Sequence, residues 1–271
     1  MARYALAAAT SGTKAIFAGG KDQFGYNYFV DIYDTATSQW DFDRLEIGRA
    51  YLTSINYGTT SLFVGGICCS DSPTDKVDIY TPDNGVQPFA ALPNARYNMA
   101  VTSNDNKFYF AGGHGASSLS SRVDIFDSNI NTWIQHTSTP LAQGRNFLGS
   151  ASAGKYVAFA GGQSGIESAT PLTVARSALS ALSAGKYIAF AGGNQFGSGA
   201  VDVVDYMDTT TSVWATAKLS NARANMGAVA VGNKMIFGGG NNRGVSDALQ
   251  DVDIFDVTDW SRTRVELPTA V

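Results

Sequence analysis

The sequence FYFAGG at residues 108–113 is followed by VDIFD at residues 123–127 and then by Trp133. The first run is apolar and ends in a glycine pair. The second run alternates apolar and polar residues, as a half-buried strand does. Both runs are rich in β-branched and aromatic residues, which favour strands. The stretch therefore predicts two strands, followed by a third strand that carries the tryptophan.

The glycine pair occurs six times, each time at the end of a short apolar run. Successive pairs are 46, 47, 49, 31 and 47 residues apart. A nearly constant spacing of this size indicates a repeat architecture in which each copy is one supersecondary unit. The pairs are Gly19 and Gly20, Gly65 and Gly66, Gly112 and Gly113, Gly161 and Gly162, Gly192 and Gly193, and Gly239 and Gly240.

Three further features recur in register with the glycine pairs. A Val-Asp-Ile-Tyr or Val-Asp-Ile-Phe run starts at residues 30, 77, 123 and 252, with a looser copy at residue 204. A tryptophan follows most of these runs, and an arginine precedes each glycine pair by a dozen or more residues. Each unit thus predicts four short strands, the first running from Tyr4 to Ala9 in the first copy. The tryptophans are Trp40, Trp133, Trp214 and Trp260, and the arginines are Arg3, Arg49, Arg96, Arg145, Arg176 and Arg223.

This order of glycine pair, aromatic strand and tryptophan resembles the kelch repeat over nearly the whole chain. The resemblance implies an all-β, kelch-type β-propeller in a single domain. The first strand of each blade would lie beside a central channel and the fourth at the rim. The glycines would let backbones approach closely, and each tryptophan would fill space between adjacent blades. We expect blades at residues 1–45, 46–92, 93–141, 142–172, 173–219 and 220–271.

The fourth unit is short. Only 14 residues separate Gly162 from Arg176, against 29 to 32 in the other units that are followed by a further arginine. The missing length matches a third and a fourth strand. The unit could be truly two-stranded, the sequence could lack a segment, or a smaller propeller could carry an insertion. We favour six blade positions with a truncated fourth blade, sealed by packing of blade one on blade six unless the chain belongs to a longer array.

Composition and charge exclude several classes of protein. The net charge is −4 and no basic cluster occurs, which argues against nucleic-acid binding. No apolar run approaches the length of a membrane span, and the N-terminus lacks the apolar core of a secretory signal. The two cysteines, Cys68 and Cys69, are adjacent and are expected to be reduced thiols on a loop. We therefore expect a cytoplasmic protein with no membrane partner.

Catalytic and metal-binding patterns are sparse. A copper site like that of galactose oxidase, also a kelch-type protein, needs two histidines, a tyrosine cross-linked to a cysteine and a second tyrosine. This chain has only His114 and His136, and its two cysteines are adjacent. The iron motif of plant specifier proteins is missing, and neither a zinc cluster nor a nucleophile elbow occurs. The aspartates fall mostly in the repeated strand motif, which indicates a structural role. We expect neither a cofactor nor a metal, and no enzymatic activity.

Two features suggest binding. The six arginines would lie at one level near the channel mouth, where kelch adaptors of ubiquitin ligases use arginine to bind acidic peptides. The alternative is that each arginine pairs with a repeated aspartate or caps a strand end. The loops after the glycine pairs vary in length, and they carry aromatic and other candidate contact residues, including Phe24, Tyr26, Tyr28, His114 and Phe196.

These observations favour a non-catalytic protein-interaction scaffold whose partner is a protein or peptide. The alternatives are a propeller that binds a small ligand or a carbohydrate, or an enzyme with a site at one end of the channel. A convergent acid–base or metal cluster would favour the enzyme, because the fold alone does not decide function.

Overall fold

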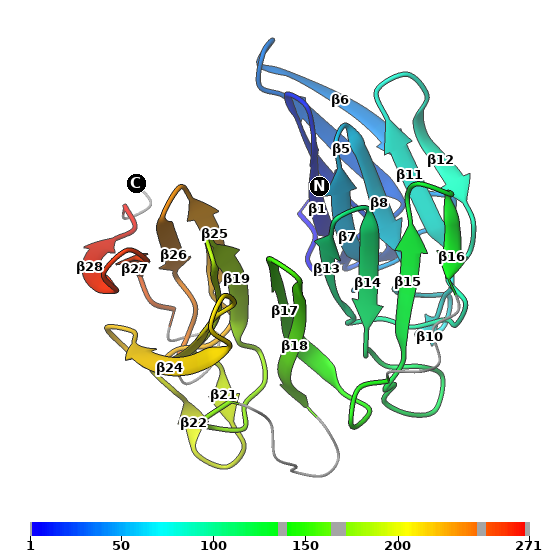
Figure 1. Ribbon diagram of the computed structural model, residues 1–271. Helices are drawn as coiled ribbons and strands as arrows, with labels where there is room; N and C mark the ends of the chain where they lie inside the picture. The colour runs from blue at the N-terminus through cyan, green and yellow to red at the C-terminus, as the bar shows by residue number, and fades with distance from the viewer. Residues whose placement is uncertain (1, 135–139, 164–171, 243–247, 269–271) are drawn as a thin grey trace. The chain divides into compact units, whose positions relative to one another are not determined.

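The computed structural model describes residues 2–134, 140–163, 172–242 and 248–268, and every regular element in these ranges is a β-strand. The chain divides into two compact units (Figure 1). The first unit comprises Met1–Val101 and Asn106–Asn146, and the second comprises Thr102–Asp105 and Phe147–Val271.

Three four-stranded antiparallel sheets lie mostly in the first unit. In each sheet the strands lie side by side in the order of the sequence. The first contains β1 (Ala7–Ser11), β2 (Lys14–Ala18), β5 (Phe29–Asp34) and β6 (Gln39–Arg44). The second contains β7 (Thr53–Tyr57), β8 (Thr60–Val64), β11 (Val77–Thr81) and β12 (Gly85–Phe89). The third contains β13 (Ala100–Asn104), β14 (Lys107–Ala111), β15 (Val123–Asp127) and β16 (Thr132–Ile134).

The second unit contains two four-stranded sheets, the two-stranded sheet of the short fourth unit and a small two-stranded ribbon. The two-stranded sheet is β17 (Asn146–Ala153) with β18 (Tyr156–Gln163). The next sheet contains β19 (Ser180–Ala184), β20 (Tyr187–Ala191), β23 (Val203–Asp208) and β24 (Val213–Lys218). The last contains β25 (Gly227–Val231), β26 (Lys234–Gly238), β27 (Asp251–Asp256) and β28 (Ser261–Glu266). The described residues thus form five full blades, and each blade is the four-stranded antiparallel sheet that is typical of an all-β, kelch-type propeller.

The short fourth unit is two-stranded where it is described. Residues 164–171, which make up most of its unusual stretch, lie outside the described residues. The first strand of each full blade begins later than expected, four residues after the repeated arginine. In the first blade β1 starts at Ala7, because Ala5 adopts a left-handed backbone with φ of 55° that interrupts the extended run after Tyr4.

The loops after three of the glycine pairs form small ribbons instead of irregular connections. These are β3 (Lys21–Asp22) with β4 (Gly25–Tyr26), β9 (Ile67–Cys68) with β10 (Ser72–Pro73), and β21 (Asn194–Gln195) with β22 (Gly199–Ala200). Residues 243–247 of the last such loop lie outside the described part of the chain.

The hydrophobic core lies between the faces of neighbouring sheets. In the first unit, Ile16 and Val30 of the first sheet belong to the same buried cluster as Phe63, Tyr80 and Val86 of the second. The alternation of buried and exposed residues along β1 is the period of two that a pleated strand produces. Packing of sheet face on sheet face is therefore what joins the blades within a unit.

The glycine pairs hold these neighbouring blades close together, as the sequence predicts. Gly19 has a φ of 70°, and a Cβ atom there would lie 2.5 Å from the carbonyl oxygen of Arg49. Gly20 has a φ of 104° and donates its N–H to the same oxygen at 2.9 Å. Other residues would be strained by these φ values and excluded by the contact. The second glycine of each of the first five pairs donates in the same way to the arginine that opens the next unit.

Candidate functional site

The side chain of the repeated arginine joins the second strand of its own blade, and the glycine pair that follows this strand, to the third strand. Arg49 donates from Nε to the carbonyl oxygen of Gly65 at 2.9 Å and from Nη2 to that of Phe63 at 3.0 Å. Its Nη1 atom bonds Asp78 of β11 at 2.6 Å. The side chain is fully buried, and burial lowers the pKa of the guanidinium while Asp78 raises it. The planar fork of arginine satisfies all three acceptors at once.

The same pairing recurs in every full blade. The aspartate is always the one in the Val-Asp motif of the third strand, and four of the five aspartates are at most 2% exposed. The pairs are Arg3 with Asp31, Arg49 with Asp78, Arg96 with Asp124, Arg176 with Asp205, and Arg223 with Asp253. Arg145 opens the two-stranded unit and is also buried, and burial lowers its pKa.

These contacts favour the structural alternative for the arginines. Arg49, Arg96 and Arg223 are among the largest fully buried side chains of the protein. The groups proposed to bind acidic peptides therefore point into their own blades. The sequence located the arginines and both halves of each pair, but it left their connection open.

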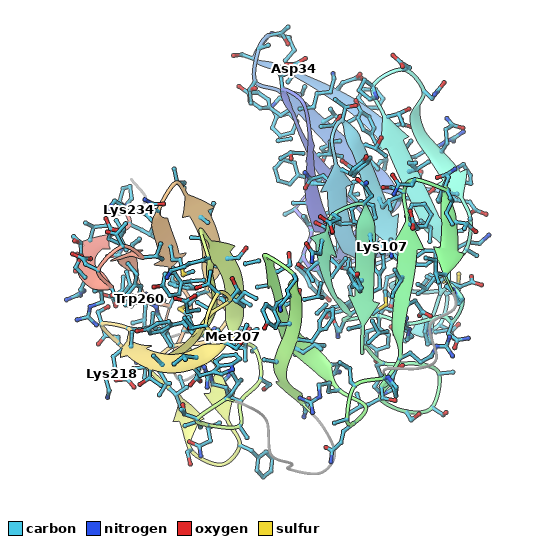
Figure 2. All side chains as sticks on the ribbon, viewed as in Figure 1. Asp34, Lys107, Met207, Lys218, Lys234 and Trp260 are labelled. Carbon is cyan, nitrogen blue, oxygen red and sulfur yellow. The ribbon has the colours of Figure 1, made fainter. Side chains whose placement is uncertain are left out.

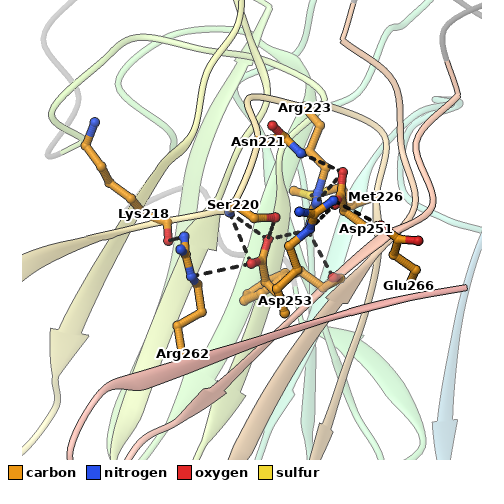
Figure 3. A network of polar contacts seen from close by, with 11 residues as sticks. Lys218, Ser220, Asn221, Arg223, Met226, Asp251, Asp253, Arg262 and Glu266 are labelled. Atoms are coloured by element: carbon orange, nitrogen blue, oxygen red, sulfur yellow. Dashed lines mark hydrogen bonds and ion pairs between the residues drawn. The ribbon is translucent and has the colours of Figure 1, made fainter.

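The paired aspartates also accept backbone hydrogen bonds. In three blades the N–H three residues before the arginine donates to the aspartate, as Ser220 does to Asp253 at 3.0 Å. Figure 3 shows this network, in which Arg223 and Ser220 converge on Asp253. In the third blade the donor position is Pro93, which has no N–H. There Arg122 binds Asp124 at 3.1 Å instead.

The residue two positions after each arginine forms a tight inner turn. All six such residues have φ between 53° and 56°, although none is glycine. Within each unit their backbones are linked: Tyr51 donates its N–H to Ala5 and Asn98 donates to Tyr51, while Ala178 donates to Phe147 and Asn225 to Ala178. These inner turns repeat one backbone with different side chains. Tyr51 and Phe147 are bulky residues, for which this left-handed conformation is strongly disfavoured.

The inner turns and the loops after the glycine pairs meet through repeated bridges. The residue after each arginine pairs with the residue after the glycine pair in five units, and the side chains differ from unit to unit. The bridges are Tyr4 with Lys21, Ala50 with Ile67, Tyr97 with His114, Ser177 with Asn194, and Ala224 with Asn241.

In the first unit, three aromatic side chains form a row where the inner turns meet the loops after the glycine pairs. The ring centroids of Tyr51 and Tyr97 are 6.3 Å apart, and those of Tyr97 and His114 are 5.3 Å apart. Sequence reasoning selected His114 but missed the tyrosines. The signal was available, because both tyrosines stand at fixed offsets from the repeated arginine. We call Tyr51, Tyr97 and His114 the aromatic row.

The other predicted loop aromatics are placed separately. Phe24 is 80% exposed, at the tip of the β3–β4 ribbon, and Phe196 in the second unit is 87% exposed. The turn below Phe24 is ordered by Asp22, which accepts hydrogen bonds from the side chain of Asn27 and from the N–H groups of Phe24 and Gly25. These bonds, the one from Asn27 foremost, lower the pKa of Asp22. Phe24 is therefore presented on a preorganised turn.

Tyr26 faces the second blade instead of solvent. Its hydroxyl donates to Asp71 in the turn between β9 and β10, and Lys21 lies 3.3 Å from the same carboxylate. The Lys21 ammonium also lies 4.5 Å from the centroid of the Tyr26 ring. This clamp of Lys21, Tyr26 and Asp71 joins the loops of the first two blades.

A groove of about 710 Å³ lies between β6 and β12 at the outer edge of the first two blades. The sequence did not predict it, since no motif distinguishes its residues. The lining mixes aromatic, charged and amide groups: Tyr28, Asp43, Arg44, Leu45, Glu46, Val86, Gln87 and Pro88.

Among the described residues no group of three or more His, Cys, Asp and Glu side chains is arranged to hold a metal ion. His114 has its Nδ1 atom 2.6 Å from the carbonyl oxygen of Gly115, and His136 lies outside the described residues. In the part of the chain that the structure describes, no helix is long and apolar enough to cross a membrane.

Comparison with known families agrees with this architecture. The Kelch motif matches residues 95–135, which extend from the inner turn of the third blade to its fourth strand. No curated protein matches the chain. The matched segment contains Arg96, the glycine pair, the Val-Asp motif and Trp133, which are the features repeated in the other blades. The chain is therefore an all-β protein of kelch-type propeller blades, with a Kelch motif in the third.

Proposed function

We propose that the chain is a non-catalytic module that binds a protein partner at the inner turns and glycine-pair loops of the first unit. One observation carries the proposal: in the first unit the same inner-turn backbone presents three different side chains, those of Ala5, Tyr51 and Asn98. Kelch propellers commonly serve as protein-binding scaffolds. Variable groups on a constant scaffold are where specificity usually resides.

The aromatic row supports this location. Tyr51 holds a left-handed backbone, which costs about 1–2 kcal/mol in a residue with a Cβ atom. Asn98 and Asn225 occupy the same position, and asparagine tolerates this conformation far better. Strain of this kind concentrates at binding sites. Tyrosine is also a common anchor in protein interfaces.

Replacing Tyr51 by asparagine tests the proposal without disturbing the fold. Y51N fits the inner turn at least as well as tyrosine does, and F147N makes the same exchange in the second unit. Captures from native cell extract should recover a partner with the wild type and F147N that Y51N loses at least tenfold. Equal recovery by all three proteins would contradict the proposal, provided that their unfolding temperatures agree.

A more specific hypothesis is that the partner binds through an acidic peptide that the arginines hold. Five of the six guanidinium groups would have to leave an internal carboxylate, and breaking a buried pair costs about 3–5 kcal/mol. The proposal therefore assigns acidic-peptide binding no more than a weak, salt-sensitive contribution. Titration of a glutamate-rich peptide into the wild type and into R96A/R145A tests it, because retained binding in the variant would exclude the arginines.

The groove between β6 and β12 favours a second candidate function, small-ligand binding. Its volume is within the range of small-molecule sites, and Tyr28, Arg44 and Glu46 offer stacking and polar contacts. A ligand that binds only the folded state must raise its stability. A thermal-shift screen of sugars and metabolites should then find a hit that R44A loses, and a screen without such a hit would remove this candidate.

We further propose that β17 and β18 form the inner half of a sixth blade position. Gly161 and Gly162 have φ of 69° and 92°, and Gly162 donates its N–H to the carbonyl oxygen of Arg176 at 2.9 Å, as in the full blades. Among the described residues β18 is paired on one side only. Its amides should exchange hydrogen faster than those of β20, and equal protection would indicate a further strand beside β18.

The cytoplasmic location is also a proposal. Cys68 and Cys69 are free thiols, which supports a reducing compartment. Localisation of a tagged chain in cell fractions tests it.

A further inference from the structure

The two adjacent cysteines lie in an unusual turn. Cys68 ends β9, pairs with Ser72 of β10 and is 7% exposed, whereas Cys69 is exposed. Cys69, Ser70 and Asp71 all have left-handed φ, of 27°, 59° and 58°. None of them is glycine, and cysteine and serine rarely adopt this backbone. The β9–β10 turn is therefore held in a strained conformation by its surroundings.

The clamp described above provides part of that restraint. Asp71 is the last of the three left-handed residues, and it accepts the hydroxyl of Tyr26 and pairs with Lys21. Both partners belong to the β3–β4 ribbon of the preceding blade. A change of backbone at Cys69 would thus be transmitted to the contact between two glycine-pair loops.

The two thiols differ in their environments. Burial, together with a hydrogen bond to the Cys69 thiol, raises the pKa of Cys68 to about 11. Cys68 therefore stays protonated and shielded while it touches its neighbour. Cys69 is open to solvent, so a reagent in solution meets Cys69 first.

We propose that Cys69 and Cys68 are a thiol modification site that reacts with low-molecular-weight disulfides and closes to a disulfide between the adjacent residues. The Cys69 thiolate attacks one sulfur of the disulfide, forms a mixed disulfide and releases one thiolate. The Cys68 sulfur then loses its proton to solvent and attacks the sulfur of Cys69. The second thiolate leaves and takes up a proton. Two protein thiols are oxidised, and the reagent is reduced to two thiols.

Closure requires the backbone of the turn to change. A disulfide needs a specific dihedral angle about its S–S bond, and adjacent residues reach it only within a small ring that includes their peptide bond. The φ of Cys69 must adjust to this ring. Asp71 then leaves Tyr26 and Lys21, so oxidation opens the clamp between the first two blades.

Treatment of the intact chain with oxidised glutathione, followed by mass spectrometry, tests the chemistry. The wild type should lose two hydrogen masses, located by fragmentation to residues 68 and 69. C68S should instead accumulate one glutathione on Cys69, because the resolving thiol is gone. C69S is the matched control and should stay unmodified, because Cys68 is buried. Stable glutathione on the wild type, or reaction of C69S, would overturn the proposal.

A trivalent arsenical is a second probe that requires both thiols but no redox step. Phenylarsine oxide should bind the wild type at least tenfold more tightly than either C68S or C69S. Equal binding by all three would show that the two sulfurs do not act as a pair, and would overturn the proposal even if one variant were poorly folded.

Hydrogen exchange tests the effect on the clamp. Oxidation of the wild type should increase exchange in residues 67–76 and 21–26 and leave β13–β14 unchanged. D71N in the reduced state should reproduce part of this increase in residues 21–26. Unchanged exchange on oxidation would show that the disulfide forms without opening the clamp.

Discussion

The buried ion pair of Arg49 and Asp78 shows how one residue organises a blade. Both side chains are inaccessible, and the arginine also satisfies two backbone carbonyls. A buried pair of this kind gains little over apolar packing when it is intact, but removal of one partner leaves a desolvated charge. Its main contribution is therefore to fix which strands meet at the inner turn.

Asp78→Ala should lower the free energy of unfolding by about 3–5 kcal/mol, because Arg49 loses its counter-ion in a dry site. Asp31→Ala removes the equivalent residue of the first blade, where the carboxylate is 43% exposed. That change should cost about 1 kcal/mol or less. Urea denaturation of both variants measures the difference, and equal costs would contradict this account of burial.

The glycine pairs make a second residue-scale prediction. Gly19 and Gly12 lie in the same blade and both have positive φ, but a Cβ atom meets Arg49 only at Gly19. Gly12→Ala should cost about 1–2 kcal/mol from the backbone alone. Gly19→Ala should cost clearly more, because the carbonyl of the next blade must also move. Thermal unfolding compares them, and similar losses would show that the close approach relaxes easily.

Sequence reasoning was most successful where a residue type has one physical use. The glycine pairs have positive φ and the Val-Asp motif lies in the third strand, as their local patterns predict. Trp40, which was expected to fill space between blades, is instead 64% exposed. The role of the arginines was left open, because a guanidinium is as well suited to a buried ion pair as to binding a carboxylate at the surface. The aromatic row was missed, because two of its members are tyrosines scattered in sequence that only the inner turns bring together.

The fourth strands β6 and β12 are the outer edges of their blades, and among the described residues no further strand pairs with them. Exposed strand edges invite pairing with other chains. In β6 the N–H groups of Phe42 and Arg44 point to the free edge, and each donates to the preceding aspartate, Asp41 or Asp43, at 2.8 Å. In β12 the corresponding N–H of Val86 donates to Asp43 at 2.7 Å, and Pro88 has none to offer.

Removal of these carboxylates should therefore promote self-association. We expect D41A/D43A to form higher-order species at concentrations where the wild type elutes unchanged from a sizing column. D41N/D43N is the matched control, because the amide oxygen still accepts the same hydrogen bonds. Association of the asparagine variant to the same extent would assign the effect to lost charge and not to the free N–H groups.

The hairpins between third and fourth strands carry a repeated ion pair. Asp208 binds Lys186, and Asp256 binds Lys234, each at 2.6 Å. Figure 2 labels Lys234 and also Asp34, which occupies the corresponding turn of the first blade. The lysine, together with hydrogen bonds from the following threonine, holds the pKa of each carboxyl below its usual value.

This lowered pKa predicts a pH dependence. The carboxylates stabilise the fold where they are charged, and that stabilisation is lost as the pH falls from about 4 toward their lowered pKa. D208N/D256N should thus unfold at a lower temperature than the wild type at pH 7, with the gap closing in acid. A gap that does not narrow between pH 4 and pH 2 would point to a cause other than charge.

At the scale of the molecule, tryptophan stacking joins one blade to the blade before it. Trp260 stacks on Tyr206 and meets Tyr187 edge-on, both in the preceding blade of the second unit. In the first unit, Trp133 donates to the carbonyl oxygen of Ala90 at 3.0 Å. Trp40 contacts only Phe17 and Tyr33 of its own blade among the ring contacts described, and it is 64% exposed.

Trp260→Ala should accordingly lower the free energy of unfolding by about 3 kcal/mol, since it empties a packed site between blades. Trp40→Ala should cost about 1 kcal/mol or less, as expected for a largely exposed residue. Chemical denaturation checks both values. Comparable losses would mean that Trp40 is covered in solution.

The repeat predicted the fold class and the four-stranded blades, because one pattern recurs in register along the chain. The fourth unit departs from that pattern, and length alone left three explanations open for it. The small ribbons after the glycine pairs also escaped prediction. Their two-residue strands have no periodicity of their own and form because the bridge at the inner turn places them.

The inner turns have an evolutionary consequence. Because their backbone is fixed by hydrogen bonds and by the arginine beneath, a single substitution there alters the surface without a structural adjustment elsewhere. Selection could therefore retarget such a protein one blade at a time, and an engineer could do the same by exchanging only the residues at these positions. Alanine, asparagine, tyrosine and phenylalanine already occupy the same turn within this one chain.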